Sequence, residues 1–148
     1  MIASLRILYY ELKANKLRPL IIKYLHGEKE YWLNKLFDYR DNDTVTRSAF
    51  SEDEIIKRIQ DTDNDLNFDN TYQLLKAKYM NDKKMLANLA SDYHTFLACL
   101  DSFRKTKSTD APNSADVGMA IQMDGTKMQV YQQFQALLGH SQGPFGGT

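Results

Sequence analysis

Cysteine and histidine are scarce in this sequence, which holds one cysteine, Cys99, and three histidines in 148 residues. A single cysteine excludes an intramolecular disulfide framework and any zinc or iron–sulfur site built from several cysteines. The histidines His26, His94 and His140 show none of the spacings with which helices bind metal ions. We therefore expect neither a metal nor a cofactor in this protein.

Long apolar runs are also missing. Arg6, Glu11 and Lys13 interrupt the first residues, so the roughly 7–15-residue apolar stretch of a signal peptide is absent. No window approaches the ~18 uninterrupted apolar residues of a membrane span. These absences predict a protein without membrane contact that is cytoplasmic or part of a virion.

Motifs that carry enzyme chemistry are absent too, among them the serine elbow and the glycine-rich phosphate loop. His94 and Cys99 lie five residues apart, a net rotation of about 140° on a helix, so they do not form a nucleophilic pair. Residues 61–69 carry alternating oxygen ligands like a calcium loop (Asp61, Asp63, Asp65, Asn67 and Asp69), but Leu66 replaces the turn glycine and Tyr72 the bidentate glutamate. We expect a solvated loop there, with incidental divalent-ion binding as the alternative, and we expect no enzyme.

The residues that are present can fill a core, since 43% are apolar and 11% aromatic. Nineteen basic and nineteen acidic residues cancel, which excludes a globally basic nucleic-acid binder. The charge is nevertheless uneven along the chain: residues 1–25 carry +4, residues 38–70 carry −6 and residues 71–108 carry +4. Such alternating blocks suit self-assembly or docking between unlike surfaces.

The first 39 residues have the apolar spacing of helices. A stripe of three leucines in the first helix is expected to pack on the core (Leu5, Leu8 and Leu12). Pro19 predicts a break and the start of a second helix. Trp32 in that helix is expected to be a core or inter-helix anchor, with a hot spot of a binding surface as the alternative. Residues 40–50 predict a loop, and Ser51 with Glu54 has the form of a capping box.

The strongest pattern is a heptad of apolar positions from Tyr72 to Phe103, which predicts a single long helix over about 70–106. Its aromatic residues favour a bundle over a bare coiled coil. Leu89 is expected in the core and Lys83 on the opposite face. Asp82 is the one violation: we interpret it as a position that sets register or specificity, or alternatively as the point where the helix reaches solvent.

The C-terminal third is set apart by a predicted linker at 107–117. We expect residues 1–106 to form a helical bundle and residues 118–148 to form a helix with a flexible interaction arm. An apolar stripe of this arm would anchor a partner (Met128, Tyr131, Phe134 and Leu138, extended by Phe145). Folding back of the arm onto its own bundle is the alternative.

The fold class expected is therefore all-α, a helical bundle with one long heptad helix and a linked C-terminal helix. Absent catalytic motifs and balanced charge favour a non-enzymatic protein–protein interaction module, a small structural or adaptor subunit of a larger assembly. Phage or viral particle components and secretion-type chaperones belong to this class, and the partners would be proteins, in a homo-oligomer or a larger complex. The alternative is a small helical nucleic-acid-binding regulator that uses basic faces of residues 1–25 and 71–108.

Overall fold

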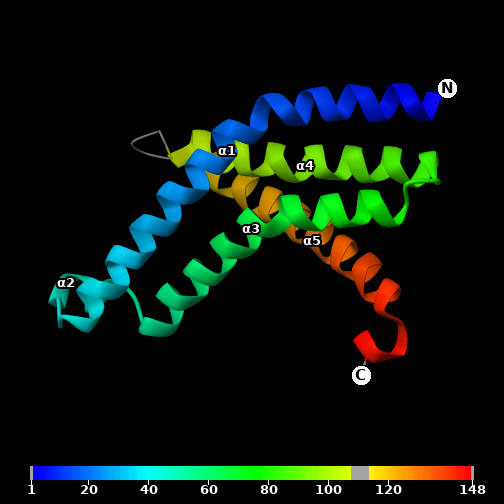
Figure 1. Ribbon diagram of the computed structural model, residues 1–148. Coiled ribbons are helices and arrows are strands. Elements are labelled where there is room, and N and C mark those ends of the chain that lie inside the picture. The colour runs from blue at the N-terminus through cyan, green and yellow to red at the C-terminus, as the bar shows by residue number, and fades with distance from the viewer. Residues whose placement is uncertain (1, 108–113, 148) are drawn as a thin grey trace. The chain divides into compact units, whose positions relative to one another are not determined.

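The computed structural model describes the backbone of residues 2–107 and 114–147, and the side chains of residues 2–106 and 122–139. These ranges contain α-helices and no strand, which confirms the predicted all-α class. Figure 1 shows the five helices, α1 (Ile2–Arg40), α2 (Thr44–Ala49), α3 (Glu52–Lys78), α4 (Lys83–Lys107) and α5 (Ser114–Gly147).

The first helix is continuous, so the predicted break at Pro19 is wrong. Proline costs a helix one hydrogen bond, but α1 buries Ala14 before it and Ile21 after it, and this packing holds the helix together across the proline. α1 is followed by a turn in which Asn42 adopts a φ of 65°. Residues 40–50, predicted as a loop, contain the short helix α2, which Asp43 caps by accepting from the Thr46 N–H at 3.0 Å.

The predicted capping box at the start of α3 is confirmed. The Glu54 N–H donates to the Ser51 hydroxyl oxygen at 3.1 Å, and the Ser51 N–H donates to Glu54 Oε1 at 3.2 Å.

The heptad segment consists of two helices, so the prediction of one helix over about 70–106 is wrong. α3 ends at Lys78, and α4 begins at Lys83 after a tight turn. The reason is Asp82, whose Oδ1 accepts from the Met85 N–H at 3.0 Å and so starts a new helix. The apolar period continues through this reversal because the two helices pack their apolar stripes against each other.

The acidic stretch 61–70 lies inside α3, so the predicted loop there is also wrong. Lysines neutralise two of its carboxylates, since Lys57 pairs with Asp61 at 3.1 Å and Lys29 pairs with Asp63 at 2.7 Å. With its charge offset in this way, the segment can remain helical despite its low helix propensity.

The chain divides into two compact units, and α1 and α3 each contribute to both. Unit 1 comprises Met1–Ile21 and Asp69–Thr148, and unit 2 comprises Ile22–Phe68. The predicted division into 1–106, 107–117 and 118–148 stays a prediction. Of the predicted linker, residues 108–113 lie outside the described residues, while residues 114–117 form the first turn of α5.

Unit 2 is organised around Trp32, which is 8% exposed, as predicted for a core anchor. Its ring meets Phe50 edge-on at a centroid distance of 5.2 Å, and the guanidinium of Arg58 lies 5.5 Å from the ring centroid. Ile55 of α3 is fully buried in the same unit. The indole thus links α1 to the segment around α2 and to α3.

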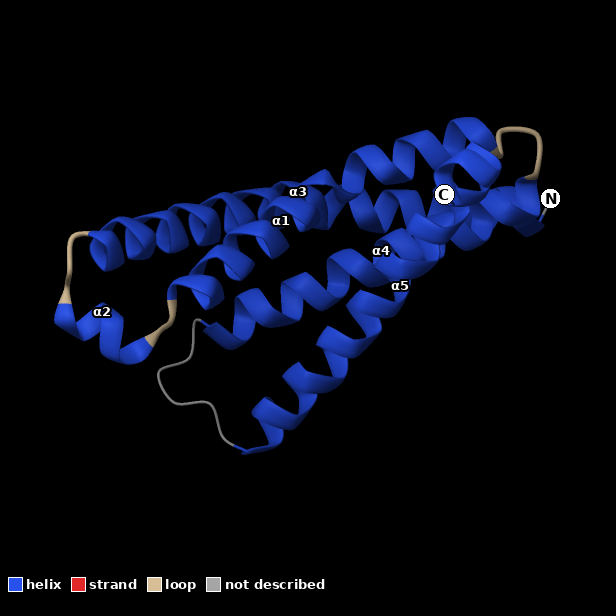
Figure 2. Ribbon diagram, turned by 90° about the horizontal axis from the view of Figure 1, so that it is seen from below, coloured by secondary structure: helices blue, strands red, loops and turns tan. Residues whose placement is uncertain are grey.

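In unit 1, the first part of α1 (residues 2–21), the end of α3 and α4 run alongside one another (Figure 1). α5 packs on α4, which it accompanies in Figure 2 as well. The core is formed mainly by side chains of α3, α4 and α5 that are at most 3% exposed (Tyr72, Leu75, Leu89, Phe96, Leu100 and Phe134). Tyr93 is 4% exposed, and α1 adds Ala14 and Ile21 at 1% each. Leu89 is buried and Lys83 is exposed, as the heptad predicted.

Candidate functional site

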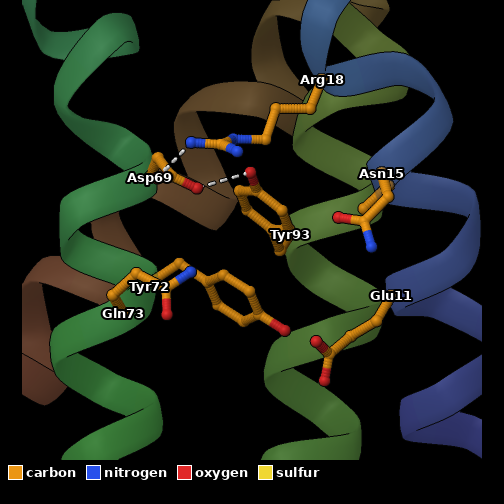
Figure 3. A pocket seen from close by; sticks show the side chains of 8 residues that line it. Glu11, Asn15, Arg18, Asp69, Tyr72, Gln73 and Tyr93 are labelled. Atoms are coloured by element: carbon orange, nitrogen blue, oxygen red, sulfur yellow. Dashed lines mark hydrogen bonds and ion pairs between the residues drawn. The ribbon is translucent and has the colours of Figure 1, made fainter.

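A polar cluster joins three helices of unit 1 at Asp69. The Tyr93 hydroxyl of α4 donates to Asp69 Oδ1 at 2.8 Å, and Arg18 of α1 donates to Asp69 Oδ2 at 3.0 Å (Figure 3). A second ion pair, between Glu11 and Lys76 at 3.1 Å, joins α1 to α3. These bonds hold the first part of α1 in one rotational setting about its own axis.

Two stacked tyrosines form the apolar wall of this cluster. The Tyr72 and Tyr93 rings are nearly parallel, with centroids 4.1 Å apart. Burial, followed by the negative charges of Glu11 and Asp69, raises the pKa of Tyr72 above its usual range. Burial also raises the pKa of Tyr93, and its hydrogen bond to Asp69 adds to the effect. Both phenols therefore remain protonated, and the Tyr93 hydroxyl acts as a donor to Asp69.

The cavity beside these residues is small, about 50 Å³, and is lined by Glu11, Asn15, Asp69, Tyr72 and their neighbours (Figure 3). It has room for a few water molecules, whereas pockets for organic ligands measure roughly 300–1,000 Å³. The cluster therefore links three helices, and its cavity is too small for an organic ligand.

The predicted C-terminal anchors are divided between core and surface. Phe134 is fully buried and lies 6.4 Å from the Tyr72 ring, so it is a core residue of unit 1 and not a free anchor, which corrects its assignment. Tyr131 and Leu138 are half-buried, and Met128 is 42% exposed. The side chain of Phe145 lies outside the described residues. The structure thus has the helix folded back onto its own unit, the arrangement that the sequence left as the alternative.

Asp82 is exposed and serves as the N-cap of α4. It is therefore not a buried register-setting residue, and the alternative, that the chain reaches solvent at this position, is confirmed. Cys99 is buried beside Met123, with a sulfur–sulfur distance of 3.7 Å, and burial raises the pKa of its thiol.

The feature that sequence reasoning missed is an exposed apolar surface on α1. The predicted leucine stripe points away from the unit: Leu5 is 60%, Leu8 56% and Leu12 55% exposed. Ile2 and Tyr9, at 76% and 52%, extend it. We call these five residues the α1 apolar face. The opposite side of the helix, with the small Ala14, is the one that packs inward, so the expectation that the leucines pack on the core is wrong.

Basic residues border the α1 apolar face. Lys13 lies over the Tyr9 ring, with Nζ 4.7 Å from the centroid, and Arg6 donates to the neutral Asn88 at 3.4 Å. Lys16 is exposed on the same side. Glu11, the only acid in the first 21 residues, is paired with Lys76. The positive charge of this border is therefore not neutralised by a carboxylate of residues 2–21.

Other basic residues of unit 1 are already committed to partners in their own chain. Arg18 pairs with Asp69, and Arg104 and Lys105 both pair with Asp101, at 2.8 and 3.2 Å. Lys78 donates to the Leu137 carbonyl at 2.7 Å. Within residues 71–108, Asp101 therefore offsets the charges of Arg104 and Lys105, and a backbone carbonyl holds Lys78. Fewer basic side chains remain for the basic face that this segment was expected to present.

Among the residues whose side chains are described, no three histidine, cysteine or acidic side chains gather in a way that could hold a metal ion. In the same part of the chain, no helix has the length and hydropathy needed to cross a membrane. Comparison of the chain with protein-family models, with curated proteins and with solved structures gives no match.

Proposed function

We propose that this protein is a non-enzymatic protein-binding module, a small structural or adaptor subunit that docks through the α1 apolar face. The observation that carries the proposal is the outward orientation of five large apolar side chains, each more than half exposed, along one side of one helix. Exposed apolar residues scattered singly are ordinary, but a contiguous set is typical of an interaction site. Burial of one such leucine stabilises a complex by roughly 1.5–3 kcal/mol.

The chemistry of the surface indicates what the partner presents. An apolar strip is needed to cover the leucines, in the manner of one helix packing against another. Carboxylates beside that strip would meet Arg6, Lys13 and Lys16, whose present contacts are neutral or solvent. We therefore expect an amphipathic protein surface with an acidic border.

Two other classes of function have less support. The cavity of about 50 Å³ at the Tyr93 cluster is smaller than the pockets in which enzymes bind organic substrates. A nucleic-acid-binding regulator would need free basic residues over 71–108, several of which are paired with acids of their own chain. Apolar leucines between the lysines of α1 would also bring no favourable contact with phosphates.

Site-specific photo-crosslinking tests the proposal. A photoreactive phenylalanine analogue at position 8, in the cells that make the protein, should yield a crosslinked protein product. The same analogue at Lys83, an exposed position at the start of α4, is the matched control and should yield none. Adding Leu5→Ser and Leu12→Ser should abolish the product without changing the melting temperature. Equal crosslinking from positions 8 and 83 would contradict the proposal.

A further inference from the structure

Unit 2 carries a surface of the opposite chemistry on the second part of α1. Phe37 is 63% exposed and Tyr31 is 45% exposed, so apolar rings face solvent here too. Glu30 lies seven residues before Phe37 and Asp38 seven residues after Tyr31, which places each acid on the stripe of one ring. We call these four residues the acidic aromatic face.

The carboxylates of this face are available. Three other acids of unit 2 are engaged in ion pairs: Glu52 with Arg40, Asp61 with Lys57 and Asp63 with Lys29. Glu30 and Asp38 are exposed and form no ion pair within the part of the chain that the structure describes.

The charge totals of the two units are equal and opposite. Unit 1 has twelve basic and eight acidic residues, a net of +4, and unit 2 has seven basic and eleven acidic residues, a net of −4. Two copies of the chain therefore offer one another unlike surfaces, although each copy as a whole is neutral.

We propose that the partner of the α1 apolar face is a second copy of this chain, which docks its acidic aromatic face there. This inference rests on the proposed function, since it names the occupant of the same surface. Phe37 of one copy covers the leucines of the other, and Glu30 and Asp38 meet the basic border that includes Lys13 and Lys16.

Three features of the molecule favour this occupant. Both faces are apolar at the centre and charged at the rim, the arrangement found in protein interfaces. Their charges are complementary, which steers association and disfavours pairing of two like faces. Each chain also holds one of each face, so every copy can both offer and accept the contact, as self-association requires.

An anionic membrane is the competing occupant, because leucines beside lysines also suit a lipid surface. The acidic aromatic face argues against it. A membrane would repel Glu30 and Asp38 and would leave Phe37 exposed, whereas a second copy uses both faces.

Sedimentation velocity of charge-swap variants tests the inference. Wild-type protein should self-associate more strongly in low salt than in high salt. The variants K13E/K16E and E30K/D38K should each lose self-association by at least roughly tenfold, because each then opposes like charges across the contact. Mixing the two variants should restore a complex, since the swapped faces are again unlike. All four side chains lie at the surface, and circular dichroism should show unchanged helix content.

The matched control is K83E/K84E, which makes the same charge change at exposed lysines of α4 and should leave self-association unchanged. Loss of association in this control, or no restoration in the mixture, would overturn the inference. So would a monomeric wild-type protein that binds vesicles of phosphatidylcholine and phosphatidylserine through Leu8. A monomer that still crosslinks another protein from position 8 would overturn the self-docking and leave the proposed function standing.

Discussion

The first part of α1 and the helix α4 lie side by side in unit 1 and carry the same apolar spacing of three and four residues, yet they use it in opposite ways. In α4 the stripe is in the core, with Leu89 at 1% and Phe96 at 1% exposure. In α1 the stripe faces solvent, with Leu5 and Leu8 more than half exposed. The same pattern thus builds a core in one helix and a surface in its neighbour.

The two stripes differ in exposure because of the residues on the side of α1 opposite its leucines. α1 turns inward a side that includes the small Ala14, at 1% exposure, and this allows its backbone to lie close to its neighbours. Ion pairs of Arg18 and Glu11 to α3 then fix that orientation. Periodicity shows that a helix has an apolar side. Whether the chain itself covers that side depends on the small residues and polar contacts of the opposite side.

We expect the largest loss of stability from a substitution in the core of α4. Leu89→Ala should lower the free energy of unfolding by about 2–5 kcal/mol, because it leaves a cavity among buried side chains. Leu8→Ala makes the same chemical change on α1 and should alter the stability of the monomer by no more than about 0.5 kcal/mol. Urea unfolding at low protein concentration measures both. Similar losses for the two variants would show that the α1 apolar face is covered within the chain.

A second effect concerns the hydrogen bond from α4 to the Asp69 carboxylate, which also pairs with Arg18 of α1. Tyr93→Phe removes the 2.8 Å hydrogen bond to the Asp69 carboxylate and should cost about 1.5–3 kcal/mol. Above the usual tyrosine pKa of 10.0, the wild-type protein should lose stability as pH rises, because the phenol ionises first in the unfolded state. The phenylalanine variant should lose less over the same range. Parallel curves of unfolding free energy against pH would contradict this reading of Tyr93.

The third effect concerns where α4 begins. Asp82→Ala removes the side-chain cap on the Met85 N–H and should cost about 1 kcal/mol, within a range of roughly 0.5–2. Asp82→Asn keeps a capping oxygen and should retain most of the stability. If alanine and asparagine are equally harmful, the charge of Asp82 matters and its role as a cap is not the main one.

How much the sequence could predict follows from the range of the forces involved. The helical class, the capping box at Ser51 and the burial of Leu89 depend on local pattern, and all three are confirmed. The reversal at Asp82 was invisible to periodicity, because an apolar stripe continues through a helical hairpin without a shift. The signal for this reversal was Asp82 itself, because aspartate is a common N-cap and stands here at the only polar position of the heptad.

The interaction surface could not be predicted for a different reason. Whether Leu5 faces inward depends on contacts of residues distant in sequence, such as Glu11 with Lys76 across 65 positions. The same holds for Phe134. The local pattern predicted a partner anchor, but the contact with Tyr72, which is distant in sequence, places its ring in the core. Complementary charge blocks were readable from the sequence, but the surfaces that display them were not.

The smallest effect tests whether charge is tolerated differently on the two helices. Asp92 of α4 is half-buried, and burial raises the pKa of its carboxyl above the ordinary value of 3.8. A raised pKa means that the folded state binds the proton more tightly, so stability falls as pH rises from the ordinary value through the folded one. Asp92→Asn removes this penalty. It should increase the melting temperature at neutral pH by less than Asp82→Ala lowers it, and the gain should vanish in acid, where wild-type Asp92 is protonated.

Lys16→Gln is the control: it removes a charge from the exposed side of α1 and should leave the stability of the monomer unchanged across this pH range. An equal response of the two variants in thermal melts across this pH range would show that α1 and α4 do not differ in exposure, and would remove the basis of the comparison.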